Sequence, residues 1–118
     1  MTMLRWSIAT VCLSGLLLWA DWQPKTVPTT LQWTTIDGKT TRLSDLRNAK
    51  AVVFVTLSTR CPAVPRYAPR FNRLYETYRR GRGVVFYGVY PEADETLESI
   101  RAHARQLGFK FPVVRQRL

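Results

Sequence analysis

The chain is poor in the residues from which metal centres and disulfide frameworks are built. Its 118 residues include two cysteines, Cys12 and Cys61, and one histidine, His103. A lone histidine without cysteines or carboxylates at ligand spacing cannot form a metal cluster, so no metal site is expected. We expect His103 to be a partly exposed surface residue on a helix, in preference to a catalytic one, and the sequence requires no cofactor.

Acidic residues are also scarce. The chain has 8 Asp and Glu against 18 Lys and Arg, which gives a formal net charge of +10. Seven arginines lie between Arg60 and Arg82, where Glu76 is the only acidic residue. A nucleic-acid-binding protein would present such a patch. The interpretation we favour is the solvated face of an amphipathic helix, which predicts no nucleic-acid partner and leaves attraction to anionic lipid surfaces as an alternative.

The N-terminus has the pattern of an export signal. A basic residue precedes an uncharged apolar run of 15 residues, from Trp6 to Ala20. This predicts a signal peptide over residues 1–20, cleaved after Ala20, and an exported protein that works in the periplasm or another extracytoplasmic space. The alternative is an uncleaved signal-anchor, with a membrane tether through residues 6–20, although about 20 apolar residues are needed to span a bilayer.

The two cysteines have different fates under this prediction. Removal of the signal takes Cys12 away and leaves Cys61 as the only cysteine, so that no intramolecular disulfide can form. Lipid attachment at Cys12 is disfavoured because Val11 stands where a small residue precedes a lipidated cysteine. A lone cysteine in an exported protein is either reactive or buried.

Residues 21–118 have the composition of a single globular domain. Two short β-like stretches, residues 31–36 and 40–43, flank Asp37-Gly38, a dipeptide favoured in tight hairpin turns. A hairpin is therefore the first predicted element. Ser44 is predicted to cap the one helical turn that follows it.

The next part of the chain alternates strands and helices. Residues 51–57 and 84–90 are continuous apolar runs rich in β-branched residues, a pattern typical of strands buried on both faces. Between them, residues 65–80 place aromatic and aliphatic side chains at helical spacing. Pro69 should kink this helix, because proline removes a backbone donor and clashes with the preceding turn.

A second helix is predicted to begin with Asp94 as its cap and to stop at Gly108. Two buried strands joined by a helix form a βαβ unit, so the sheet is predicted to be parallel, with Cys61 and Tyr90 at the same edge. Sites on such sheets gather at this edge. Glu92, just beyond Tyr90, is expected to be a solvated loop acid, with a proton acceptor as the alternative.

Cys61 is expected at the first turn of the first long helix. Unpaired backbone N–H groups and the positive end of the helix dipole favour thiolate over thiol at such a position. Arg60 and Arg66 add positive charge, and Ser58 or Thr59 could donate a hydroxyl hydrogen bond to the sulfur. A thiolate at neutral pH is a nucleophile toward disulfides and peroxides. The alternative is a small hydrophobic side chain buried under the end of the strand.

Three segments carry a resemblance to a known family: TRCPAVPRYAP, with Pro69 eight residues after the cysteine, the strand VVFYGVYP, and FPVV near the end. Over about residues 24–115 the chain resembles the thioredoxin-like superfamily, and specifically its redoxin branch of the alkyl hydroperoxide reductase/thiol-specific antioxidant type. The resemblance implies an α/β thioredoxin-like fold with an N-terminal β-hairpin. It also implies that Cys61 is the attacking cysteine and that Pro69 kinks the active-site helix.

The sequence departs from this family in three respects. Val64 stands where dithiol members have a resolving cysteine, and Phe54 replaces a proline of the peroxiredoxin motif, of which Ser58 supplies the hydroxyl. The family's cis-proline loop, antiparallel strand pair and last helix have no counterpart here. We therefore expect residues 21–118 to form a partial domain, incomplete at its C-terminus. Either the chain is a truncated or split reading frame, or another chain completes the fold.

The predicted function is thiol-dependent redox chemistry. Cys61, assisted by Ser58, Thr59 and Arg60, would attack a peroxide or disulfide substrate. Because no second cysteine is close in sequence, an external thiol reductant or redox partner protein would resolve the product. The alternatives are a non-catalytic binding or accessory module that keeps the fold, and a truncated inactive fragment.

Overall fold

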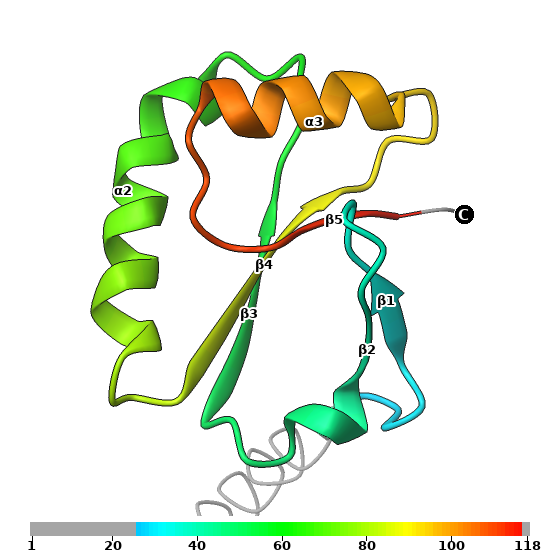
Figure 1. The fold of residues 1–118 in the computed structure, drawn as a ribbon, viewed down its shortest axis with the longest axis vertical. Coiled ribbons are helices and arrows are strands. Elements are labelled where there is room, and N and C mark those ends of the chain that lie inside the picture. The colour runs from blue at the N-terminus through cyan, green and yellow to red at the C-terminus, as the bar shows by residue number, and fades with distance from the viewer. Residues whose placement is uncertain (1–25, 117–118) are drawn as a thin grey trace, which may run out of the picture.

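The computed structural model describes residues 26–116, which form a three-stranded parallel sheet, two helices and an N-terminal hairpin (Figure 1). The predicted signal over residues 1–20 and Cys12 lie outside these residues. Among residues 26–116 no helix is long and apolar enough to cross a membrane. In chain order the elements are β1 (Gln32–Thr34), β2 (Thr40–Arg42), the 3-10 helix η2 (Leu43–Leu46), β3 (Ala51–Thr56), α2 (Ala63–Arg79), β4 (Val84–Tyr90), α3 (Leu97–Gln106) and β5 (Val113–Arg115).

The predicted hairpin is confirmed. β1 and β2 pair antiparallel around Asp37-Gly38, and Gly38 has a φ of 88°, which a residue with a Cβ rarely adopts. The predicted cap at Ser44 is wrong. The cap position belongs to Arg42, two residues earlier, and the carboxylate of Asp45 accepts the Arg42 N–H at 3.0 Å.

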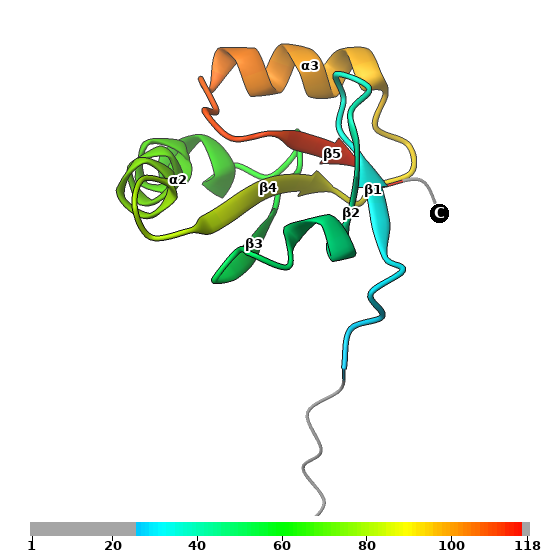
Figure 2. The ribbon, with the colours of Figure 1, turned by 60° about the horizontal axis from the view of Figure 1, so that its bottom comes forward.

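The main sheet has the strand order β3–β4–β5, and both pairs are parallel, as predicted. The hairpin packs beside β5 (Figure 2), where Thr35 forms an isolated antiparallel bridge with Val114. The Ile36 N–H donates to the Val113 carbonyl at 2.8 Å. β3 is the edge strand of the sheet that residues 26–116 form.

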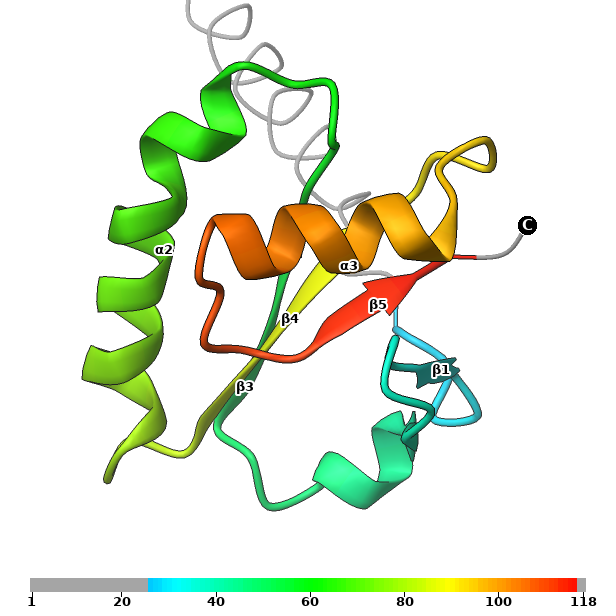
Figure 3. The ribbon, with the colours of Figure 1, turned by 45° about the horizontal axis from the view of Figure 1, so that its top comes forward.

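The core lies between the sheet and the two helices. α2 and α3 run in different directions over it (Figure 3), and the first turns of α2, which contain Pro69, lie at an angle to the rest of that helix. Gly88 sits where the packing is closest, because a Cβ there would lie 2.7 Å from Leu57 Cδ1. The buried apolar residues of this cluster are Leu57, Val64, Phe86, Tyr90, Ile100, Phe111 and Val113.

The prediction that both strands are buried on both faces holds for β4 far better than for β3. Val53 and Val55 pack against the core, but Phe54, on the opposite face, is 44% exposed. Its ring contacts Trp33 of the hairpin edge-on, with centroids 5.1 Å apart, and stacks on Tyr87. An edge strand whose second face is only partly covered by a hairpin cannot bury a phenylalanine completely.

The helix boundaries differ slightly from the prediction. α3 begins later than expected, because Thr96 caps it and accepts the Ser99 N–H at 3.1 Å. Asp94, the predicted cap, instead pairs with Arg60. Gly108 follows the end of α3 with a φ of 62°, as expected of a residue that ends a helix.

Candidate functional site

Cys61 lies in the short turn between β3 and α2, at the carboxyl edge of the parallel sheet. Its N–H points to the Ser58 carbonyl at 3.4 Å, and its own carbonyl accepts the Val64 N–H at 3.2 Å. The side chain is half-buried and packs against the hydrophobic core. Cys61 is therefore neither fully buried nor detached from the fold, and it stands directly before the first turn of α2.

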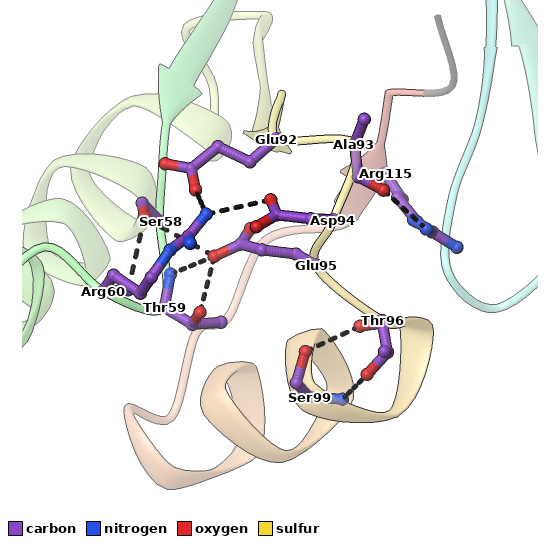
Figure 4. A network of polar contacts seen from close by, with 10 residues as sticks. All are labelled: Ser58, Thr59, Arg60, Glu92, Ala93, Asp94, Glu95, Thr96, Ser99 and Arg115. Carbon is purple, nitrogen blue, oxygen red and sulfur yellow. Dashed lines mark hydrogen bonds and ion pairs between the residues drawn. The ribbon is translucent and has the colours of Figure 1, made fainter.

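The loop between β4 and α3 brings a carboxylate to this turn (Figure 4). Glu95 Oε1 accepts two short hydrogen bonds from Thr59, one from the backbone N–H at 2.6 Å and one from the hydroxyl at 2.5 Å. The Ser58 hydroxyl approaches the same oxygen at 3.5 Å. The two residues before Arg60 are thereby tied to a residue 36 positions later in the chain.

Glu95 is almost fully buried, with 4% of its surface exposed. Its second oxygen, Oε2, is buried and has no hydrogen-bond partner among the described residues. Hydrogen bonds to a carboxylate are about twice as strong as those between neutral groups, and they strengthen where water is excluded. The Thr59–Glu95 contact is therefore the firmest polar attachment of the turn that carries Cys61.

The sequence predicted that Arg60 would add positive charge near the thiol of Cys61. The structure directs this charge elsewhere. The Arg60 guanidinium pairs with Glu92 and, at 2.9 Å, with Asp94, at the exposed surface (Figure 4). The hydrogen bond from Arg60 lowers the pKa of Glu92. Glu92 is thus a half-exposed carboxylate engaged in an ion pair, in agreement with the favoured prediction of a loop acid and not with a proton acceptor.

The hydroxyls of Ser58 and Thr59 were expected to serve the cysteine sulfur. The structure directs both toward Glu95 instead, and Ser58 Oγ also accepts the Arg60 N–H at 3.2 Å. The four predicted residues Ser58, Thr59, Arg60 and Cys61 do share one turn. Three of them contact the β4–α3 loop, and only the cysteine faces the core.

Behind this turn, Tyr90 and His103 form a hydrogen-bonded pair. Tyr90 has no exposed surface, and burial, reinforced by the negative charge of Glu95, raises the pKa of its hydroxyl above its ordinary value. Burial lowers the pKa of His103, and the charge of Glu95 partly opposes that shift. His103 is half-buried, in line with the predicted partial exposure, but its tyrosine partner was not predicted.

Glu95 is the residue of this site that the sequence analysis missed. The available signal was its position, because an acidic residue between the second apolar strand and the next helix must lie at the same sheet edge as Cys61. Glu92 and Asp94 occupy the same loop. Among residues 26–116 no three histidine, cysteine or acidic side chains are grouped so as to hold a metal ion.

Residues 25–117 match the AhpC/TSA family. The chain belongs to this family. The resemblance found in the sequence is thus confirmed, and so is the predicted α/β thioredoxin-like fold with its N-terminal hairpin, because solved thioredoxin-like structures superpose on most of this chain.

The relatives of this AhpC/TSA family member include named redox proteins. The chain is 34% identical over 80 residues to the thiol-disulfide oxidoreductase ResA of Bacillus thuringiensis. The alignment covers 68% of this chain and 44% of ResA. A secreted disulfide oxidoreductase of Mycobacterium tuberculosis superposes with a TM-score of 0.57 and 19% identity, over 74% of this chain and 60% of that one. A thiol-disulfide oxidoreductase from Bacteroides fragilis gives a TM-score of 0.62 and 15% identity, over 78% and 66%. The chain thus spans less than half the length of the curated relatives that it matches.

Proposed function

We propose that this protein is a thiol-disulfide oxidoreductase in which Cys61 is the nucleophile. The observation that carries the proposal is the position of Cys61: a half-buried cysteine at the carboxyl edge of a parallel sheet, directly before helix α2. Backbone N–H groups at a helix N-terminus favour the thiolate form. The names of the matched relatives support disulfides as the substrate class.

The proposed reaction proceeds in two exchange steps. The Cys61 thiolate attacks one sulfur of a substrate disulfide, forms a mixed disulfide and releases the other substrate sulfur as a thiolate. An external thiolate then attacks the substrate sulfur of the mixed disulfide, which frees Cys61 and leaves a disulfide between substrate and reductant. The electrons therefore come from the external thiol, and Cys61 returns to its starting state.

An external reductant is proposed because the described residues hold no second thiol. Cys61 is the one cysteine among residues 26–116, and buried Val64 occupies the position one turn further on. A peroxide is the second candidate substrate, since the same thiolate would be oxidised to a sulfenic acid with release of water or an alcohol. The absent second cysteine also favours one different function, that of a non-catalytic module that keeps the fold.

The site of action is proposed from the N-terminus. The pattern of residues 1–20 predicts export, and one structural relative is described as secreted. We propose that the domain works outside the cytoplasm, where its partner is a thiol-bearing protein or small thiol. Retention by residues 6–20, as a membrane tether, is the alternative to cleavage.

The test is mixed-disulfide formation with glutathione disulfide, followed by mass spectrometry. The full-length Cys12→Ser variant isolates Cys61, and Cys12→Ser/Cys61→Ser is its control. We expect one glutathionyl group on the first variant and none on the second, at a rate well above that in concentrated urea. Equal rates in buffer and urea would mean that the fold does not activate the thiol, and would favour the non-catalytic module over the oxidoreductase. Reaction with hydrogen peroxide but not with glutathione disulfide would favour a peroxide as the substrate.

A further inference from the structure

The turn that carries Cys61 is joined to the β4–α3 loop by one buried carboxylate. We propose that Glu95 is a positioning residue, which fixes the Ser58–Cys61 turn and so holds the thiol at the N-terminus of α2. Glu95 would act through Thr59 and not through contact with the substrate. This inference rests on the proposed function, because it assigns a role in the reactivity of the same cysteine.

The distances favour Glu95 over the local turn as the group that sets the backbone. The turn's own hydrogen bond, from the Cys61 N–H to the Ser58 carbonyl, is 3.4 Å long and lies near the limit for such bonds. The bond from the Thr59 N–H to Glu95 Oε1 is 2.6 Å long. Because one of the two Thr59 donors is the backbone amide, this contact restrains the main chain two residues before Cys61 as well as a side chain.

The burial of Glu95 also supports a positioning role. A buried side chain with one oxygen lacking a partner is costly, and here the other oxygen accepts both Thr59 donors. Unsatisfied buried polar groups in native structures call for an explanation, and functional sites are where such costs are commonly retained. Positioning of the nucleophile supplies that explanation here.

A second contact between the same loops provides a matched control. Arg60 pairs with Glu92 and Asp94, but these side chains are exposed, and Asp94 keeps 68% of its side-chain surface. Exposed ion pairs are screened by water and salt and contribute little to stability. The two kinds of contact therefore predict different outcomes for substitutions only one residue apart.

The experiment measures the rate at which iodoacetamide alkylates Cys61 in the full-length Cys12→Ser protein near neutral pH, with folding followed by circular dichroism. We expect Glu95→Ala to slow alkylation about tenfold while the protein stays folded, because a displaced nucleophile loses its alignment with the helix. Glu95→Gln keeps an acceptor oxygen and should stay within about threefold of the parent. Asp94→Asn should react at the parent rate.

Two results would overturn the proposal. One is a folded Glu95→Ala variant that is alkylated at the parent rate, and the other is a Glu95→Gln variant that is alkylated as slowly as Glu95→Ala.

A second pair of variants keeps the proposal testable if Glu95→Ala does not fold. Thr59→Val removes the hydroxyl donor but leaves the backbone bond, and Thr59→Ser retains both. We expect alkylation to slow about threefold in Thr59→Val and to be restored in Thr59→Ser; equal rates in both variants would refute the positioning role. Alkylation requires no disulfide exchange, so a protein that fails to form a mixed disulfide would refute the proposed function alone.

Discussion

The hydroxyl of Tyr90 lies 2.6 Å from Nδ1 of His103, and this hydrogen bond links β4 to α3. Tyr90 is completely buried, and His103 lies on the side of α3 that is shielded from solvent. Protonation of the imidazole would place a positive charge in a half-buried position. The pair is therefore a point at which mild acid should act on the fold.

Stability should fall as the pH decreases below about 6.5, the ordinary pKa of histidine. Burial lowers the pKa of His103, so in this window the unfolded chain binds the proton more readily than the folded one, and the free energy of unfolding decreases. Urea unfolding near pH 7.5 and near pH 5.5 measures the loss. The loss should be smaller in His103→Gln. Equal losses in both proteins would contradict the prediction, since the lowered pKa of Glu92 acts only below about 4.5.

Two phenylalanines on neighbouring strands should differ sharply in their contribution to stability. Phe86 on β4 is 6% exposed and packs under the helices, so Phe86→Ala should cost about 3–5 kcal/mol. Phe54 on β3 is 44% exposed and contacts the hairpin, so Phe54→Ala should cost roughly 1–2 kcal/mol. Urea unfolding of the two variants at one protein concentration makes the comparison. A loss at Phe54 as large as that at Phe86 would mean that another chain covers this face in solution.

A cysteine at position 64 should give the protein a resolving thiol of its own. Val64 is buried one turn after Cys61, and its N–H bonds to the Cys61 carbonyl. In Val64→Cys, prepared in the Cys12→Ser background, the second thiol should displace glutathione from Cys61 and leave an intramolecular disulfide. Mass spectrometry should then show loss of two hydrogens and no glutathionyl group. Ala63→Cys, at an exposed position, is the control and should retain the adduct. A lasting adduct on the Val64→Cys variant would contradict this geometry.

The parts of the fold that are set by local pattern could be predicted from the sequence. The apolar runs defined β3 and β4, Asp37-Gly38 defined the hairpin, and the spacing of apolar residues defined α2 and α3. Helix caps were less predictable, because Asp94 is a suitable cap in isolation but is drawn to Arg60 in the folded chain. The exposure of Phe54 depends on what covers the sheet, which the pattern of a single strand does not encode.

For the candidate site, sequence reasoning placed the residues but not their contacts. Cys61 was expected at the start of a helix, and Ser58 and Thr59 were expected beside it. That both hydroxyls face Glu95 depends on how the β4–α3 loop folds back over the strand ends, a tertiary relationship between segments far apart in the chain. Acidic residues at three positions of that loop, Glu92, Asp94 and Glu95, differ mainly in burial, and burial is a property of the folded structure.

The attachment of Thr59 to Glu95 has a consequence for the order in which the chain matures. The two residues are separated by 36 positions, so their hydrogen bonds form only after the chain has closed a long loop. During synthesis, Cys61 emerges well before its partner segment. The cysteine is therefore an ordinary thiol on a nascent chain, and it acquires its native surroundings only when the chain through Glu95 has emerged and folded.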